Sequence, residues 1–448
     1  MPAVYPFAAV QYSSGRGDVS RFVAPPYDVI DTRQKAELLS HDPRNVVAID
    51  LPHTPAKELG PPAAYQGAAE QYRAWLAEGA LSRRDTPAMF AYRQSFDFRG
   101  DRYQRCGMAC CVQTVPFGPR EGGGVLPHEQ TFSGPKEDRL ALMKATSAQF
   151  SPIFSLHADD TGAATALLHK VMAARKPDMT ADLGDGVLHE VWTIDDTPTI
   201  GAYRDALAGE DIFIADGHHR YNTALNYLAS LEAAGPVPAD HPARRTMMVL
   251  VGMSDPGLAI GPTHRVLGAM KDYSLNALRI ALDPYFTIQS VGAGARAIEQ
   301  AVADHPANAE GRSVLGLIDF ASGECFTCAL KDADPLARDF ADKPRAWRTL
   351  DVALVQHLIV EKICEPKLNG GQPVKWAFPH SVAEALEIGS GAETGAGGGA
   401  GFAQFAVIVR PTPLEAVKEI SRAGELMPQK STFFYPKLAT GLFINPLA

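Results

Sequence analysis

Apolar and polar segments alternate along the chain in a way that predicts both helices and strands. Apolar residues three and four positions apart predict a helix over residues 65–76. Two strand-like runs, 88–98 and 105–115, are separated by the polar sequence RGDR, which is typical of a hairpin. Further strands and helices alternate from about residue 150 to residue 267. The pattern therefore predicts an α/β fold of mixed α+β character.

The last third of the chain keeps this pattern, with one low-complexity interruption. It predicts an amphipathic helix over 351–363, a strand over 402–410 and a helix over 413–424. The Gly-rich segment 389–401 is typical of a loop. A chain of 448 residues is too long for one ordinary core. We predict an N-terminal α/β domain, a central domain and a C-terminal α/β domain that carries the Gly-rich loop, at residues 1–120, 121–270 and 271–448.

Composition narrows the class of protein. The apolar fraction of 46% and the charged fraction of 21% are those of an ordinary globular protein. A net charge of −9 makes nucleic acid an unlikely partner, because nucleic-acid affinity rests on clustered cations. No apolar run is long enough to cross a bilayer, and the first twelve residues lack a basic signal-peptide region. We expect no membrane partner and a cytoplasmic location.

The cysteines predict neither a disulfide framework nor a metal site. Six cysteines are few for a chain of this size, and we interpret Cys106, Cys110 and Cys111 as small buried residues. Cys325 and Cys328 form a lone C-x-x-C within the strand-like sequence GECFTCAL. Without a second pair, this motif does not predict zinc or redox chemistry. We assign no metal ligands.

The sequence DGHHR, Asp216 to Arg220, gathers the strongest candidate chemistry. Apolar residues 212–215 predict a strand before it, and Tyr221, Leu225 and Leu228 predict a helix after it. Gly217 permits a tight turn, and the amide groups at the start of the helix favour a bound anion, to which the guanidinium adds donors. The alternative is structural: the aspartate caps the helix and the two histidines are hydrogen-bonded surface groups.

The loop HEQTFSGPKEDR offers a second group of candidates. His128 and Glu129 are suited to general acid or base catalysis, with Thr131 beside them. Lys136 and Arg139 are suited to clamping a polyanion. The alternative is that the sequence from the lysine to the arginine forms only a solvated first turn of a helix.

Three shorter motifs supply further candidates. His264 and Arg265 follow a strand in the sequence PTHR, and Tyr27 and Asp28 follow two stiff prolines in APPYDV. Near the end, GELMPQKS has lysine and serine at Walker spacing but glutamine in place of the second glycine, which excludes a P-loop. The alternative for PTHR is a surface turn, the alternative for APPYDV is a tyrosine that only packs, and the alternative for the closing segment is a charged strand edge. Phosphate or substrate contacts at the closing segment would come from Lys430, Ser431, Thr432 and Lys437.

Five motifs taken together resemble a known family. APPYDVI, HEQTFSGPKEDR, ADGHHRYNTAL, PTHRVL and MPQKSTFFYPKLATGL occur in this order and resemble the bacterial and archaeal family DUF1015, a domain of unknown function. The stretch IADGHHRYNTAL is also similar to the phosphate-binding box of the ParB and sulfiredoxin superfamily, some of whose members resemble free serine kinases. The resemblance implies a ParB/sulfiredoxin-like nucleotide-binding core with additional α/β domains.

The resemblance also implies roles for individual residues. It places phosphate contacts on the turn, with Asp216 positioning a metal, the substrate or the turn itself. A glutamate upstream of the box acts as base in the superfamily kinases, and Glu129 is the candidate here, although its separation from the box exceeds the ParB spacing. The turn residues that would contact phosphate are Gly217, His218, His219 and Arg220.

These observations predict a nucleotide-dependent phosphotransferase that uses Mg²⁺ and ATP or ADP. Its acceptor would be a small hydroxylated metabolite, with free serine as the first candidate. The alternatives are a phosphoserine phosphatase and a non-catalytic, ParB-like nucleotide-binding regulator. The sequence specifies neither the acceptor nor the oligomeric state. If one anionic ligand is shared, the motifs should converge on one cleft, which would be lined by His128, His218, His264 and Lys430.

Overall fold

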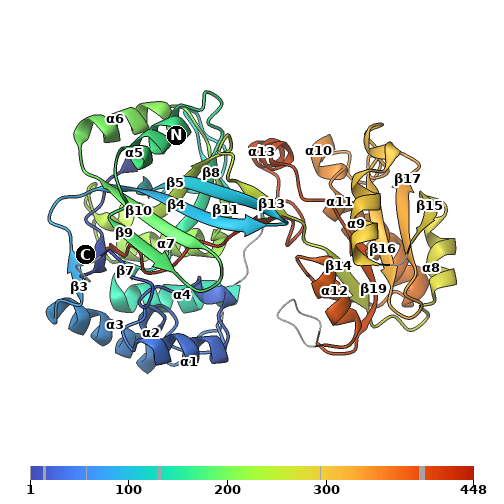
Figure 1. Cartoon of the computed structure of the whole chain (residues 1–448), viewed down its shortest axis with the longest axis horizontal. Helices are drawn as coiled ribbons and strands as arrows, with labels where there is room; N and C mark the ends of the chain where they lie inside the picture. Colours follow the sequence, from blue (N-terminus) through green and yellow to red (C-terminus); the bar gives the residue numbers. More distant parts are fainter. Residues whose placement is uncertain (1, 14–16, 57, 130–132, 293, 393–398) are drawn as a thin grey trace. The chain divides into compact units, whose positions relative to one another are not determined.

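The computed structural model describes the chain except for residues 1, 14–16, 57, 130–132, 293 and 393–398. It divides into two compact units. Unit 1 comprises Met1–Ala259 and Phe434–Ala448, and unit 2 comprises Ile260–Phe433. Each unit contains one large sheet with helices packed on it (Figure 1), which confirms the predicted mixed α/β class.

Unit 1 is organised around a nine-stranded mixed sheet. Its order is β6-β11-β8-β12-β5-β4-β10-β9, with β1 also paired to β5. Only the β11–β6 and β12–β8 pairs are parallel. Strands from both the first and the second predicted segments, 1–120 and 121–270, therefore join one sheet. The strands are β1 (Val4–Tyr5), β4 (Met89–Phe98), β5 (Asp101–Gln113), β6 (Val125–Leu126), β8 (Ile153–His157), β9 (Met179–Asp182), β10 (Leu188–Ile194), β11 (Ile212–Asp216) and β12 (Arg245–Gly252).

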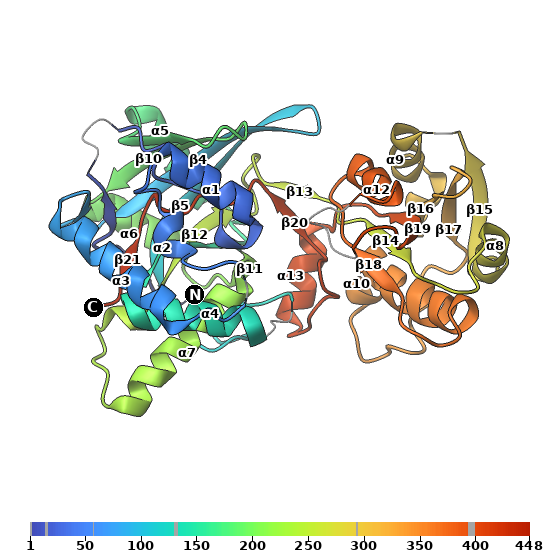
Figure 2. The same cartoon turned by 90° about the horizontal axis from the view of Figure 1, so that it is seen from below.

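Helices cover this sheet. Helices α5 and α6 pack against an apolar layer that includes Met108 and Cys110 of β5 and Trp192 of β10. Helix α4 packs against both α3 and α7, and the three helices lie near one another in Figures 1 and 2. The helices of unit 1 are η1 (Tyr27–Val29), α1 (Thr32–His41), α2 (Val47–Asp50), α3 (Pro62–Ala77), α4 (Ser133–Thr146), α5 (Ala163–Ala174), α6 (Thr197–Ala206), α7 (His218–Ala234) and η2 (Pro242–Arg244).

The predicted hairpin is present, and its second strand is longer than expected. Phe98 of β4 faces Asp101 of β5, so β5 starts within the polar RGDR sequence. Arg99 and Gly100 form the turn, both at positive φ. The sequence pattern placed the start of the strand at residue 105, because the intervening residues are polar. Asp101, Arg102 and Gln104 are exposed at the free end of the hairpin, where a strand does not need apolar side chains, and Tyr103 is half-buried.

The closing segment of the chain returns to unit 1. Ala24 pairs with Thr440 and Val10 pairs with Ile444, while Leu442, Phe443 and Ile444 are completely buried. Gly441 has φ +98°, and a Cβ there would lie 3.0 Å from Val46. These contacts hold the last fifteen residues inside unit 1, the unit that also contains the start of the chain. Unit 1 also contains two short strand pairs. In one, β2 (Val10–Tyr12) pairs with β3 (Leu81–Arg83), and in the other, β7 (Ala148–Gln149) pairs with β21 (Asn445–Pro446).

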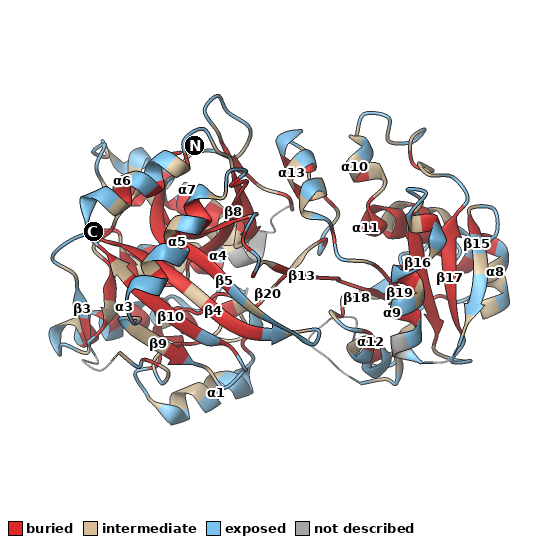
Figure 3. Cartoon of the chain, turned by 45° about the horizontal axis from the view of Figure 1, so that its top comes forward, coloured by how far each residue is buried: buried red, intermediate tan, exposed pale blue. Residues whose placement is uncertain are grey.

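Unit 2 contains a six-stranded antiparallel sheet in the order β15-β17-β16-β19-β14-β18. Figure 3 shows its central strands buried. The sheet strands are β14 (Arg265–Gly268), β15 (Phe286–Val291), β16 (Val314–Asp319), β17 (Cys325–Leu330), β18 (Lys375–Ala377) and β19 (Ala403–Ile408), and short β13 (Ala259–Gly261) and β20 (Phe433–Tyr435) lie at the unit boundaries. The helices are α8 (Leu275–Leu282), α9 (Ala295–Ala303), η3 (Pro306–Asn308), α10 (Arg345–Arg348), α11 (Asp351–Ala353), η4 (Leu354–Leu368), α12 (Val382–Gly389) and α13 (Leu414–Arg422).

The helix predicted over 351–363 is present, and one face of it is buried. It begins as α11 and continues as the π-helix η4, which extends to Leu368. Because a π-helix has more residues per turn than an α-helix, the buried side chains of η4 recur every four to five positions along one face, which packs into the main core of unit 2. The polar residues between them, such as Gln356, Glu361 and Lys362, are half-buried or exposed.

The cysteines are free thiols, and all six are buried. Cys325 and Cys328 lie three positions apart in β17, so they face opposite sides of the sheet and pack into different apolar clusters. The C-x-x-C motif therefore forms no shared site. Among the described residues, no helix has the length and apolar character needed to cross a membrane.

His189 of β10 is a buried histidine that the fold keeps uncharged. Burial, followed by the charge of Arg105, lowers its pKa from 6.5 to about 3. Its Nδ1 lies 2.6 Å from the hydroxyl of Tyr92. As the pH falls below 6.5, the unfolded chain binds a proton at this histidine that the folded chain does not bind. Acidification therefore lowers the free energy of unfolding.

Replacing His189 by asparagine should make this acid sensitivity smaller. Between about pH 7 and about pH 4.5, this histidine should lower the free energy of unfolding by about 2 to 3 kcal/mol. Asparagine keeps a hydrogen-bonding group near Tyr92 but does not titrate. Urea denaturation across this pH range measures the effect, with His41→Asn as an exposed control. Equal pH slopes for His189→Asn and wild type would contradict the prediction.

Candidate functional site

The DGHHR sequence forms the strand-to-helix turn that the sequence predicts. β11 ends at Asp216 and α7 begins at His218. Gly217 stands between them with φ +105°, a left-handed conformation that favours glycine. Gly217 is the N-cap residue of α7 and has no side chain with which to cap the helix. The structural alternative, in which Asp216 is the N-cap residue, is therefore wrong, and the start of α7 is a position suited to an anion.

Two buried histidines pack at this turn. The rings of His128 and His218 meet edge to face, with their centroids 4.6 Å apart. The backbone N–H of His128 donates to Nε2 of His218 at 3.2 Å, which leaves Nδ1 as the protonated nitrogen of a neutral His218 ring. Burial lowers the pKa of both rings, and the neighbouring His128 lowers that of His218 further. Both therefore act as neutral hydrogen-bonding groups near pH 7, and neither is a surface histidine.

Charged side chains with partial exposure surround the two histidines. The Glu129 carboxylate lies 3.9 Å from Nε2 of His128 and is 22% exposed. Asp216 Oδ2 lies 3.1 Å from Nη2 of Arg220 and 3.5 Å from Nζ of Lys437. The charge of Asp216 raises the pKa of His128, and the charge of Lys437 lowers it. One partly exposed site in unit 1 therefore combines two carboxylates, one ammonium group and two neutral imidazoles.

The backbone on both sides of Lys437 is fixed by buried polar side chains. Gln94 donates to the Lys437 carbonyl at 2.9 Å, and Arg105 donates to the carbonyls of Tyr435 and Pro436 at 3.1 and 2.6 Å. The Arg105 guanidinium is buried over the ring of Phe154, 4.3 Å from its centroid. Burial lowers the pKa of Arg105 to about 10, so it remains a cation at neutral pH. Sequence reasoning missed these two residues, because each lies within a predicted strand and far in the sequence from the closing segment that it contacts.

Arg220 is held on two sides. Its Nη1 donates to the Pro152 carbonyl and its Nη2 to Asp216. Its guanidinium also lies over Gly217, where a Cβ would come within 3.0 Å of Nε. The side chain therefore fixes the turn. A direct phosphate contact from its other N–H groups stays a prediction.

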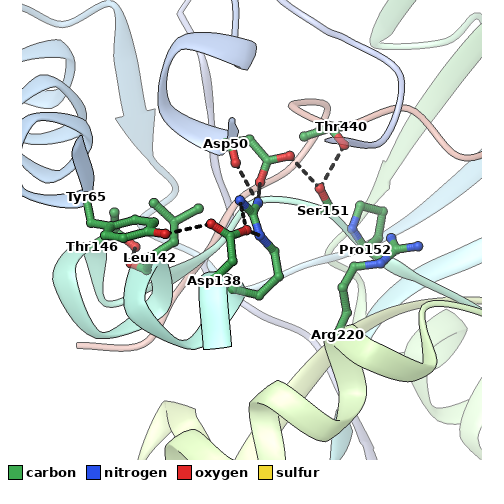
Figure 4. A network of polar contacts seen from close by, with 10 residues as sticks. Asp50, Tyr65, Asp138, Leu142, Thr146, Ser151, Pro152, Arg220 and Thr440 are labelled. Carbon is green, nitrogen blue, oxygen red and sulfur yellow. Dashed lines mark hydrogen bonds and ion pairs between the residues drawn. The ribbon is translucent and has the colours of Figure 1, made fainter. Parts of the chain in front are cut away.

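Arg139 belongs to a buried ionic network, drawn in Figure 4. Its Nε and Nη2 lie 2.7 Å from Asp138 Oδ2, and its Nη1 lies 2.5 Å from the Asp50 carbonyl and 3.3 Å from Asp50 Oδ1. Tyr65 donates to Asp138 at 2.7 Å, and Ser151 donates to Asp50 at 2.9 Å. The sequence alternative of a solvated first turn is wrong for Asp138 and Arg139, because both are buried. Lys136, in the same turn, is half-buried.

Tyr27 and Asp28 lie near the two arginines. A cavity of about 40 Å³ is lined by Tyr27, Asp50, Arg139 and Arg220, among others. The Arg139 guanidinium lies over the Tyr27 ring, 4.0 Å from its centroid. Asp28 Oδ1 is buried and accepts no hydrogen bond from the described residues. Thr131, the remaining candidate of the HEQT loop, lies outside the described residues.

Unit 2 brings its own predicted residues together. Arg265 is buried and donates to the carbonyls of Thr263, Gln429 and Lys430 at 2.6, 3.2 and 3.1 Å. The PTHR motif and the closing MPQK motif are thus adjacent. His264 is buried, with Nδ1 accepting from Val409 N–H at 3.2 Å. The surface-turn alternative is wrong for this histidine and arginine.

The remaining candidates of unit 2 differ in exposure. Lys430 is exposed and has φ +56°. Ser431 is buried and donates to the Pro428 carbonyl, while its own carbonyl accepts from Thr412 at 2.6 Å. Thr432 is half-buried. Convergence of these residues with those of unit 1 on a single ligand stays a prediction.

Comparison with known proteins identifies the family. A family model described as "Protein of unknown function (DUF1015)" matches residues 4–353, which is more than half of the chain. The chain belongs to this family. No curated protein matches it. The likeness of the turn to the ParB and sulfiredoxin superfamily stays a prediction.

Several solved structures are similar to the DUF1015 chain at low identity. A mutant free serine kinase in complex with ADP is 13% identical, with 73% of this chain and 95% of that chain covered and a TM-score of 0.31. A conserved hypothetical protein from Pyrococcus furiosus is 14% identical, with coverage of 73% and 98% and a TM-score of 0.30. SbnI with a C-terminal truncation, from Staphylococcus aureus, is 8% identical, with coverage of 76% and 87% and a TM-score of 0.32.

Proposed function

We propose that this DUF1015 protein is a phosphotransferase that moves a phosphoryl group from ATP or ADP to a small hydroxylated metabolite, with free serine as the first candidate. The observation that carries the proposal is the glycine-capped start of α7 beside Lys437, Asp216 and Glu129. Amide groups and an ammonium hold phosphates, and carboxylates accept a proton or hold a metal. Phosphoryl transfer needs little more than this positioning and charge.

The phosphates of the nucleotide would bind at the start of α7. Its first N–H groups and its positive dipole end favour an anion. His218 adds a neutral N–H donor at Nδ1, and Lys437 adds a positive charge next to Asp216. His219 and Arg220 would contribute donors from the same turn. Lys136, at the end of the HEQT loop, would neutralise negative charge on the phosphates. Arg139 would do the same through the N–H groups that its ionic network leaves available.

Glu129 would act as the general base. It would take the proton of the acceptor hydroxyl while the hydroxyl oxygen forms a bond to the terminal phosphorus of the nucleotide. The bond between that phosphorus and the leaving phosphate oxygen breaks, and the shortened nucleotide departs with the electron pair. His128, which lies next to Glu129 and is neutral, would hold the carboxylate in position rather than transfer the proton itself.

The acceptor and the metal would use the remaining carboxylates. Asp28 has a buried oxygen that accepts no hydrogen bond from the described residues, which suits an ammonium or hydroxyl donor of an acceptor such as serine. Mg²⁺ is commonly held by one or two carboxylates together with substrate phosphates, so Asp216 would suffice beside the phosphate position. Bound there, the ion would supply charge neutralisation for the transferred group. Further substrate contacts are proposed at Tyr27, Thr131, Ser431, Thr432 and Lys437, and further phosphate contacts at His264, Arg265 and Lys430.

A turnover assay tests the proposal. The protein is incubated with Mg²⁺ and either ATP or ADP, together with serine or one of a panel of hydroxylated metabolites, and phosphorylated products are measured by mass spectrometry. A phosphorylated acceptor formed in step with nucleotide consumption is the expected result. Release of phosphate from phosphoserine without nucleotide would indicate the phosphatase instead. Nucleotide binding with no turnover of any acceptor would indicate a nucleotide-binding regulator.

Replacing Lys437 by methionine should weaken nucleotide binding by about 10- to 100-fold, because a charge-assisted contact to phosphate contributes roughly 1.5 to 3 kcal/mol. The side chain is partly exposed, so the melting temperature should change little. Isothermal titration calorimetry with ADP measures the affinity. Lys176→Met, at an exposed position of the same unit, is the matched control. Equal affinities in the two variants would remove Lys437 from the site.

A further inference from the structure

A second cluster of reactive side chains lies in unit 1, on the sheet rather than at the β11–α7 turn. Cys106 of β5, His169 of α5 and Asp255 after β12 each place a ligand atom within 4.8 Å of the other two. His169 Nε2 is 3.6 Å from Asp255 Oδ2. In the sheet order, β8 and β12 separate β5 from β11. The cluster takes no part in the proposed phosphoryl transfer.

Packing of three elements creates the cluster. Cys106 belongs to the apolar layer of β5 on which Ala164, Leu168 and Met172 of α5 pack, and His169 lies on that same helix. The loop after β12 approaches the β5 backbone so closely that a Cβ at Gly257 would lie 2.0 Å from the Gln104 carbonyl oxygen. Only glycine permits this approach, which brings Asp255 next to Cys106.

Hydrogen bonds fix the orientation of Asp255. Its Oδ1 accepts from Gly257 N–H at 2.8 Å, and its Oδ2 accepts from Cys106 N–H at 3.3 Å. Oδ2 is also the atom that faces His169. The carboxylate is therefore held in place by backbone groups. The ligands of metal sites are commonly oriented in this way, by hydrogen bonds from residues that do not themselves contact the metal.

The Asp255 carboxylate has no lysine or arginine partner among the described residues. Its side chain is completely buried, and within the described parts of the chain no lysine or arginine lies at ion-pair distance from it. The charged form of a buried carboxylate is stabilised by a paired charge or a metal ion, because burial removes its hydration. Among the described residues, His169 is the one basic side chain at ion-pair distance, and it is about half exposed, while the charge of Arg105 acts on the carboxylate from further away. A divalent cation between the three side chains would supply the missing charge.

The same surroundings argue against a nucleophilic cysteine. Burial, then the charge of Asp255, raises the pKa of Cys106 to about 12. A reactive cysteine requires the opposite, a thiol whose pKa is lowered by a nearby cation or helix start. A coordinated metal ion, in contrast, deprotonates a thiol outright.

The cluster is accessible to solvent through a cavity of about 530 Å³. Cys106, His169 and Gly257 line this cavity together with Arg93, Tyr103 and Met172. An ion can therefore enter along the exposed side of His169. Three protein ligands also leave one coordination position for water or another small ligand, as in open zinc sites.

We propose that Cys106, His169 and Asp255 form a binding site for Zn²⁺. Sulfur, imidazole nitrogen and carboxylate oxygen are the three ligand types that zinc accepts in tetrahedral sites. No pattern in the sequence predicts this site, because its three residues are far apart in the chain and belong to no spacing motif.

Cobalt substitution tests the site, because Co²⁺ bound by a thiolate in tetrahedral geometry absorbs strongly. The metal-free full chain is titrated with Co²⁺ and then with Zn²⁺, and the sulfur-to-cobalt charge-transfer band is followed. One equivalent of Co²⁺ should produce the band, and Zn²⁺ should displace it. Cys106→Ser should abolish the band, whereas Cys110→Ser, a buried cysteine on the same face of β5, should retain it.

His169→Ala supplies a variant that does not disturb the core, because the side chain is half exposed. Its Zn²⁺ affinity should fall at least about 10- to 100-fold, whereas His41→Ala, at another exposed position, should bind like wild type. The proposal is overturned if wild type gives no charge-transfer band, if the band survives in Cys106→Ser, or if His169→Ala binds Zn²⁺ as tightly as wild type.

Discussion

Replacing Glu129 by glutamine should reduce phosphoryl transfer by about two orders of magnitude or more while nucleotide affinity stays near normal. A general base contributes about 10²- to 10⁴-fold to the rate, whereas a residue that only holds the ligand changes binding. Glutamine keeps the size of the side chain and most of its hydrogen bonding but does not accept a proton. Both quantities are measured on one preparation, turnover by product formation and affinity by calorimetry.

Glu137→Gln is the matched control, since this exposed glutamate lies eight residues further along, on α4. It should keep wild-type turnover. Full activity in Glu129→Gln would assign the base to another carboxylate, and Asp216 would be the next candidate. Failure of wild type to phosphorylate any acceptor would instead contradict the phosphotransferase proposal as a whole, and the zinc site would remain testable by itself.

Replacing Arg139 by methionine should lower the free energy of unfolding by about 3 to 5 kcal/mol. The substitution leaves Asp50 and Asp138 buried without their common cation, and an uncompensated buried charge costs about this much. The loss arises in the folded state and does not require a ligand. Chemical denaturation of the ligand-free protein measures it.

Arg73→Met, on the exposed surface of α3, should change the free energy of unfolding by less than about 0.5 kcal/mol. Adding Asp50→Asn to Arg139→Met should restore part of the loss, because it removes one of the two unpaired charges. If Arg139→Met were as stable as wild type and bound nucleotide less tightly, the arginine would be a ligand contact, as the sequence pattern suggested, and the network would not stabilise the fold.

Local signals in the sequence were sufficient for the centre of the site. The apolar run before Asp216 and the apolar spacing after it place the turn between β11 and α7, and the structure confirms both elements. The same holds for the β4–β5 hairpin and for the strand that carries Cys325 and Cys328. In each case the signal is a run of mostly apolar residues, or an apolar spacing, that lies within about ten residues.

The surroundings of the site depended on contacts that no local pattern records. Arg139 meets Asp50 across 89 positions of sequence, and Arg105 meets Pro436 across 331. Nothing about an arginine in a polar loop distinguishes a buried ionic network from a phosphate clamp, because both use the same donors. The apolar pattern over 351–363 predicted a helix, but neither its π-helical form nor its extension to Leu368 was predicted.

The return of the closing segment to unit 1 has a consequence for the order of folding during synthesis. Residues 434–448 belong to unit 1, but the ribosome makes them only after the whole of unit 2. The first 259 residues therefore emerge without Lys437 and without the buried side chains of Leu442, Phe443 and Ile444. A domain folds as a unit once its chain is available, so unit 2 is free to fold first, and the nascent unit 1 must wait with part of its core open. The phosphate site that we propose would thus be assembled last, once Lys437 has been added to the chain.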